Sequence, residues 1–96
     1  GAPGPPTQPA VFNLTRVFPN PFNATTSIDF TLQVEGATRL EVFNLRGQLV
    51  TVLLDGHAGA GRHIFSFDGN GHASGVYLVR LQQGQQIATG KMLLVK

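Results

Sequence analysis

The sequence lacks several residue types that functional sites often need. It has no cysteine, no tryptophan and one tyrosine, and charged residues make up only 12% of its 96 positions. Without cysteine, the chain can form no disulfide, no thiolate metal site and no cysteine nucleophile. Its arginines and lysines are scattered singly, whereas a nucleic-acid interface needs positive charge gathered on one face. No segment approaches the roughly 20 consecutive apolar residues that cross a bilayer. We therefore expect neither a nucleic-acid partner nor a transmembrane segment.

Residues 1–10 differ in composition from the rest of the chain. They are rich in proline and glycine, which favours an extended polyproline II spacer that cannot supply a core. The whole chain is 42% apolar with a net charge of +2, whereas disordered chains combine low hydrophobicity with high charge. We therefore divide it into a Pro/Gly-rich linker at residues 1–10 and one folded domain at residues 11–96. Because it lacks an initiating methionine, we expect it to be a fragment of a larger protein.

Short segments in which apolar and polar residues alternate predict β-strands. Ile28, Phe30 and Leu32 share one phase of such a segment, and residues 39–42, 62–67 and 77–81 repeat the alternation. A last strand is expected over residues 87–95.

Two features of this pattern make further predictions. Asp29 and Glu41 fall on the polar phase of their strands, and we expect them on a solvated face. The segment 48–54 is almost continuously apolar, which is typical of a strand that is buried on both faces or lies at a sheet corner.

Turn-forming residues separate these segments and define the fold class. They are Glu35-Gly36, Arg46-Gly47, Asp55-Gly56, Gly59 to Gly61, Asp68 to Gly71 and Gln83 to Gln85. No window shows a sustained helical period. About seven short strands at this spacing predict an all-β, immunoglobulin-like antiparallel β-sandwich.

The titratable residues do not form a catalytic or metal-binding pattern. His57, His63 and His72 are six and nine residues apart, so no close pair presents two imidazoles together. The loop at residues 68–71 resembles the start of a calcium loop but lacks the further ligands, and we expect a turn there. We therefore predict that the domain is not an enzyme and has no catalytic, cofactor-binding or metal residues.

An accessory module that binds carbohydrate or cell wall for a secreted hydrolase is an alternative function. Such a surface typically presents a row of exposed aromatic rings. The seven phenylalanines of this chain mostly fall at positions that fit the core.

The strand pattern leaves three groups of residues unexplained. They are FPNPFN at residues 18–23, LEVFNLRGQLV at residues 40–50, and ASGVYLVRL at residues 73–81 followed by KMLLVK at residues 91–96. In order and spacing they resemble the C-terminal sorting domain (type A) of the type IX secretion system, found in Gram-negative Bacteroidetes-type bacteria. The resemblance runs from about Val17 to Lys96. This family is related to immunoglobulin-like domains that include a flagellar hook-capping domain.

The resemblance implies a function, partners and a location. Domains of this family resemble immunoglobulin-like β-sandwiches that follow a secreted cargo domain. The outer-membrane translocon recognises them. A sortase-like peptidase usually cleaves them, and the cargo is attached to surface lipopolysaccharide or released. The resemblance thus implies a sorting and cell-surface-anchoring module of a larger secreted protein, which we expect to be a hydrolase, transiting the periplasm. Cleavage would fall in the linker or just after it.

The resemblance also implies which residues form the recognised signal. By this implication they are Gly90, Lys91, Met92, Leu93, Leu94, Val95 and Lys96.

The other motif residues have structural roles that follow from their chemistry. Pro19 and Pro21 lack an amide donor and suit a sheet edge, where Asn20 can bond neighbouring backbone groups. Gly47 suits a positive φ in a turn. We expect Gly75 to leave room for close approach before Tyr77, whose ring fills the core while its hydroxyl needs a partner. The structural motif residues are Pro19, Asn20, Pro21, Phe22, Gly47, Gly75 and Tyr77.

Overall fold

The alternating segments form seven β-strands in a computed structural model that describes residues 12–96. The strands are β1 (Leu14–Phe18), β2 (Thr25–Leu32), β3 (Gly36–Asn44), β4 (Leu49–Ala58), β5 (Gly61–Asp68), β6 (Gly75–Gln83) and β7 (Gln86–Leu94). The linker predicted at residues 1–10 lies outside the described residues. Within residues 12–96, no helix is long and apolar enough to cross a membrane.

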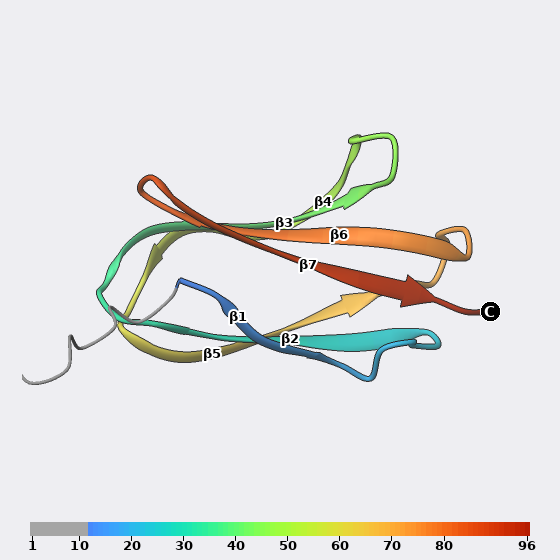
Figure 1. Cartoon of the computed structure of the whole chain (residues 1–96), viewed down its shortest axis with the longest axis horizontal. Coiled ribbons are helices and arrows are strands. Elements are labelled where there is room, and N and C mark those ends of the chain that lie inside the picture. Colours follow the sequence, from blue (N-terminus) through green and yellow to red (C-terminus); the bar gives the residue numbers. More distant parts are fainter. Residues whose placement is uncertain (1–11) are drawn as a thin grey trace, which may run out of the picture.

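The strands pair into two antiparallel sheets that face each other (Figure 1). One sheet has the order β1-β2-β5 and the other has the order β4-β3-β6-β7. This confirms the predicted immunoglobulin-like sandwich. In the constant-type immunoglobulin fold the fourth strand pairs in the sheet of the first two strands. Here β4 pairs with β3 instead, and the chain crosses to the other sheet between Ala58 and Gly61.

The core lies between the two sheets and is filled by the inward phase of each strand. Phe30, Leu40 and Val79 are completely buried, and Tyr77 and Leu81 lie on the same face of β6 as Val79. Removing each such side chain from water stabilises the fold by about 1.5–3 kcal/mol. The alternation in the sequence therefore identified the core-facing side of the strands correctly.

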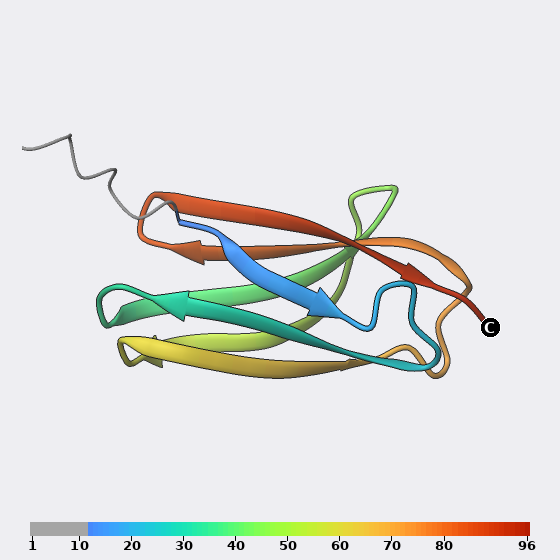
Figure 2. The same ribbon diagram turned by 60° about the horizontal axis from the view of Figure 1, so that its bottom comes forward.

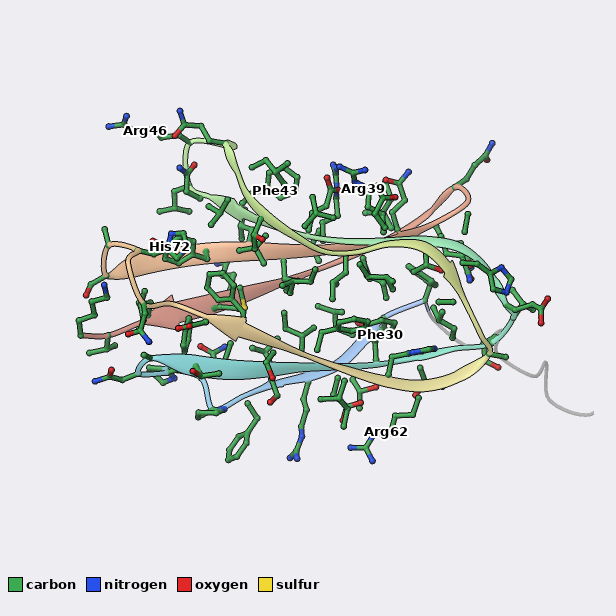
Figure 3. The ribbon with its side chains drawn as sticks, turned by 180° about the vertical axis from the view of Figure 1, so that it is seen from behind. Phe30, Arg39, Phe43, Arg46, Arg62 and His72 are labelled. Carbon is green, nitrogen blue, oxygen red and sulfur yellow. The ribbon has the colours of Figure 1, made fainter. Side chains whose placement is uncertain are left out.

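The prediction that Asp29 and Glu41 lie on a solvated face was wrong. Their side chains point away from the core, but only 6% of Asp29 and 4% of Glu41 is exposed. Arg62 on β5 covers Asp29, with Nε and Nη2 donating to its two carboxylate oxygens at 3.1 and 2.8 Å. Arg80 Nη2 donates to Glu41 Oε1 at 2.8 Å, and Arg39 Nε lies 2.8 Å from Oε2. Long arginine side chains can cover such groups with their apolar stems, and Arg39 and Arg62 lie on the outer faces of opposite sheets (Figure 3).

The continuous apolar run of β4 does not reflect burial on both faces, so that alternative was wrong. β4 is an edge strand, and Leu49 and Val52 are 49% and 37% exposed. Its pairing with β3 shifts register at two points, between Leu40 and Glu41 and again after Val42. A bulge interrupts strict alternation, so apolar residues that are adjacent in sequence can reach the same face. The chain changes sheets only between Ala58 and Gly61, after the segment 48–54 for which a sheet corner was the second alternative.

The sandwich has two dissimilar ends, which Figure 2 shows on opposite sides. The proximal end holds the start of β1 and the turns at residues 33–35, 59–60 and 84–85. The distal end holds residues 19–24, 45–48, 69–74 and 95–96. All three groups of unexplained motif residues contribute to the distal end.

Candidate functional site

The motif segments, which are far apart in the sequence, are neighbours in the structure. β6 lies between β3 and β7, so Phe43 pairs with Leu78, which in turn pairs with Lys91. Residues 40–50, 73–81 and 90–96 therefore form adjacent parts of one sheet (Figure 1). The remaining motif, at residues 18–23, runs along the outer edge of β7.

We call residues 19–23 the clasp because they bond the free edge of β7. Asn20 Nδ2 donates to Lys91 O at 2.8 Å, and the amide of Leu93 donates to Asn20 Oδ1 at 3.0 Å. The amide of Phe22 donates to Leu93 O at 2.8 Å, and the amide of Val95 donates to Phe22 O at 2.9 Å. Phe22 and Leu94 thus form a parallel β-bridge. The clasp satisfies backbone groups that an edge strand otherwise leaves unpaired.

The clasp modifies one prediction made from the sequence. The two prolines do lie at a sheet edge, where their missing amides cost nothing. Asn20, however, bonds backbone groups 71 and 73 residues away rather than neighbouring ones. An asparagine amide carries both a donor and an acceptor, so one side chain can pair with a strand edge as a peptide group does.

Two buried side chains anchor this contact in the core. Phe22 is 2% exposed, and its ring packs edge-on against Phe67 with centroids 5.9 Å apart. Leu94 is 1% exposed and lies against Gly69. A Cβ added at Gly69 would come within 2.8 Å of both Leu94 Cδ1 and Ala24 O. The sequence analysis read Gly69 only as a turn residue and missed this close approach, because nothing in the sequence places Leu94 beside it.

The predicted signal residues divide into an anchored set and a displayed set. Met92 and Leu94 are buried, whereas Leu93 and Val95 are 37% and 46% exposed and the two lysines are also exposed. Gly90 is half-buried against the opposite sheet, and a Cβ there would lie 2.9 Å from Leu14 Cδ1. The strand is therefore held by one face while its other face remains accessible.

The chain end and the neighbouring loop are also joined. The Lys96 amide donates to Ser74 Oγ at 3.1 Å. Tyr77, two strand positions into β6, donates its hydroxyl to Ala73 O at 2.6 Å, which supplies the partner that its buried ring requires. The loop before β6 is thereby fixed next to the end of the chain.

The two glycines of the motifs act through their backbone. Gly47 has φ of 81° in the turn between β3 and β4, as the turn requires. The predicted close approach at Gly75 was wrong, because no heavy atom lies within 4 Å of a Cβ placed there. Its φ of 147° gives the physical reason for glycine, since side chains rarely tolerate this region.

The histidines and aromatic rings are dispersed in the structure. His57 lies on β4, His63 stacks on Phe30, and His72 stacks on Phe67. Residues 12–96 contain no group of three histidine or acidic side chains placed to hold a metal ion. Among the aromatic residues of this part of the chain, Phe18, 60% exposed, is alone in being mainly solvent-accessible. This observation does not favour a carbohydrate-binding surface.

Comparison with known proteins identifies the family to which this arrangement belongs. A family model described as the secretion system C-terminal sorting domain matches residues 16–96. No curated protein and no solved structure matches the chain. The match includes the clasp, all the motif segments and the terminal strand. The chain therefore belongs to the secretion system C-terminal sorting domain family, which is not a catalytic family, and it serves as a sorting signal for type IX secretion of a preceding cargo toward the cell surface or exterior.

Proposed function

We propose that residues 11–96 act as a sorting and cell-surface-anchoring module, and that residues 90–96 are the part the outer-membrane translocon recognises. The cargo that precedes it is a secreted hydrolase. The supporting observation is the way β7 is presented: Met92 and Leu94 are buried, the clasp fixes the strand edge, and Leu93 and Val95 face solvent. Such a strand offers a fixed set of side chains only when the domain has folded.

The position of the two ends supports the same role. The described chain starts at the proximal end, and residues 95–96 lie at the distal end (Figure 2). A cargo that precedes β1 would join the module on the side away from the signal. The translocon could then contact residues 90–96 without displacing the cargo. Cleavage by a sortase-like peptidase, in the linker at residues 1–10 or just after it, would release the cargo for attachment to surface lipopolysaccharide.

The test is a fusion of residues 10–96 to a periplasm-directed fluorescent protein in a host with type IX secretion. We expect fluorescence on the cell surface or in the medium, and we expect deletion of residues 91–96 to retain it in the periplasm. Ser66→Ala, at an exposed position of β5 outside the motifs, is a control that should be exported normally. The proposal is wrong if the deletion variant is exported as efficiently as the intact module.

A further inference from the structure

The turn between β3 and β4 is rigid but places two side chains in solvent. Asn44 Oδ1 accepts hydrogen bonds from the amides of Arg46 and Gln48 at 2.9 and 3.0 Å, and Asn44 Nδ2 donates to Gln48 Oε1 at 2.8 Å. Leu45, at the tip, is 68% exposed. Arg46 projects away from both sheets (Figure 3). The local network therefore fixes the backbone that carries Leu45 and Arg46, although neither side chain contributes to the core.

The cations of the chain divide into two groups. Arg39, Arg62 and Arg80 each pair with a carboxylate at 3.1 Å or less, in the middle of the sheets or toward the proximal end. Arg16, Arg46, Lys91 and Lys96 make no ion pair with any side chain of residues 12–96.

Three of these four cations lie on or beside the distal end, whereas Arg16 lies on β1, over the Phe18 ring. Arg46 and Lys96 are part of it, and Lys91 lies on the outer side of β7 beside it. One side-chain carboxylate of the described chain is nearby, that of Asp68, which accepts a hydrogen bond from the Asn70 amide. This surface therefore has an excess of positive charge.

A groove of about 320 Å³ separates this turn from the loop before β6. Leu45 and Arg46 line one side, and Ser74, Gly75 and Val76 line the other. The hydrogen bond from the Lys96 amide to Ser74 Oγ brings the end of the chain to the rim of the groove. The groove thus combines an apolar side chain on each wall with a free guanidinium and an adjoining lysine.

We propose that the distal groove is a second recognition surface, which docks an acidic loop of a protein of the export machinery. In this complex a carboxylate of the partner binds Arg46, and a neighbouring apolar side chain of the partner enters between Leu45 and Val76. This inference rests on the proposed function and adds a contact distinct from residues 90–96.

Charge complementarity and preorganisation support an acidic protein partner. A guanidinium binds a carboxylate through two parallel hydrogen bonds. This contact with a partner is strongest when no carboxylate of the domain itself competes for the guanidinium. The Asn44 network has already fixed the turn, so docking would lose little conformational entropy. The apolar walls suit a side chain rather than a free anion.

The charge part of the inference can be tested with the fluorescent fusion. Arg46→Glu should reduce the rate of export about tenfold, because charge reversal turns electrostatic attraction into repulsion. Arg16→Gln is a control for the loss of an exposed arginine, since Arg16 lies over the Phe18 ring at 5.0 Å on the other sheet and is remote from the groove. We expect it to be exported normally. Both purified variants should melt as the wild type does.

The outcomes separate this inference from the proposed function. Export of Arg46→Glu at the wild-type rate, with deletion of residues 91–96 still blocking export, overturns the inference alone. Retention of the wild-type fusion in the periplasm contradicts the proposed function and the inference together. Flotation of the purified domain with vesicles rich in phosphatidylglycerol tests a membrane partner, and binding that is lost in Arg46→Glu would replace the acidic protein by an anionic lipid surface and so overturn the inference.

Site-specific crosslinking tests the geometry of the groove. Because the chain has no cysteine, Leu45→Cys introduces a single attachment point for a photoactivatable maleimide. Val34→Cys, 61% exposed at the proximal end, is the control. We expect an adduct with one component of the export machinery from position 45, reduced about tenfold when Arg46→Glu is added. Equal adducts from both positions, or no effect of Arg46→Glu, would overturn the inference.

Discussion

The two ends of the sandwich are closed by similar chemistry but to different effect. At the proximal end, Gln83 Nε2 donates to Val34 O at 2.9 Å and to Thr38 Oγ1 at 3.2 Å, and the Gln83 side chain is buried. At the distal end, the Asn20 amide bonds both Lys91 and Leu93, but the contact is exposed. The proximal amide, that of Gln83, joins the turn before β3 to the sheet and does not hold an exposed strand in place. The distal amide fixes a strand whose outer face stays accessible, so the same kind of amide contact is buried at one end and leaves a strand exposed at the other.

The largest difference between the two ends should appear in stability and hydrogen exchange when a buried side chain at one end is truncated. Phe22→Ala should lower the free energy of unfolding by about 3–5 kcal/mol, and Leu32→Ala, near the proximal end, by about 2–5 kcal/mol, because both side chains are at most 2% exposed. Urea unfolding measures both. Only Phe22→Ala should also speed hydrogen exchange at the Val95 amide beyond the global change. Equal exchange at Val95 in the two variants would remove the distinction between the ends.

A matched pair of glycine variants tests the close approach at the distal end. Gly69→Ala should cost about 1–3 kcal/mol, because the new methyl group would collide with backbone oxygen Ala24 O and with Leu94, each 2.8 Å away. Gly36→Ala at the proximal end should be nearly neutral, because the nearest atom, Gln83 Nε2, is 3.5 Å away. Melting temperatures of the two proteins give the comparison. A neutral Gly69→Ala would show that Leu94 is not held against this loop.

The two amide side chains provide the third comparison. Asn20→Ala should cost about 1 kcal/mol, since the freed groups of β7 are exposed and can bond water. Gln83→Ala should cost about 1–3 kcal/mol, because it removes the donor to Val34 O and to Thr38 Oγ1 in a more buried place, and Thr38 keeps only its bond to Gly36 O. In the fluorescent fusion, we expect only Asn20→Ala to reduce export. Lower export from the less stable Gln83→Ala would instead indicate that stability alone limits secretion.

The smallest effect is expected from lowering the pH, which should reduce the stability of both ends equally. Hydrogen bonds from Arg62 hold the pKa of Asp29 below its usual value despite burial. Burial raises the pKa of Glu41, but hydrogen bonds from Arg80 and Arg39 outweigh it and keep the pKa below the usual value. The unfolded chain therefore takes up these protons first as pH falls. Stability is full above about pH 5 and declines toward the lowered pKa values.

Urea unfolding across this pH range should show the decline, and Asp29→Asn should reduce its slope. Hydrogen exchange at Leu93 and at residues of the proximal turns should rise in parallel, because both carboxylates lie in the middle of their strands. Faster exchange at one end only would show that a carboxylate outside this pair controls the acid response.

The sequence predicted the sandwich because alternation is a local property that each strand carries by itself. The positions of Ile28, Phe30 and Leu32 were enough to identify the core face of β2. The same argument failed for Asp29 and Glu41. Arg39 is two residues from Glu41, but Arg62 and Arg80, which also cover these carboxylates, are 33 and 39 residues away along the chain. Alternation shows that a side chain points away from the core, but it cannot show what a neighbouring strand lays over it.

The site was predicted less completely than the fold. The resemblance identified residues 18–23 and 90–96, but neither the resemblance nor the composition showed that these segments bond each other. Asn20 was expected to bond nearby backbone, because a local partner is the usual one for this side chain. Gly69 gave only a turn signal, since the reason for its small size is Leu94, 25 residues later. Contacts between remote segments are set by topology and register, which no single segment encodes.

The distance along the chain between the two halves of the clasp has a consequence for biosynthesis. The hydrogen bond from Asn20 to Lys91 closes a loop of 71 residues, and β7 is the last strand of the domain to be made. The ribosome synthesises the clasp before β7, so the hydrogen bonds between them can form only after the end of the domain has been made. A polypeptide that stalls or is truncated before β7 keeps the motif at residues 18–23 but has no strand for it to bind. The clasp can therefore form only in chains whose synthesis has continued through β7.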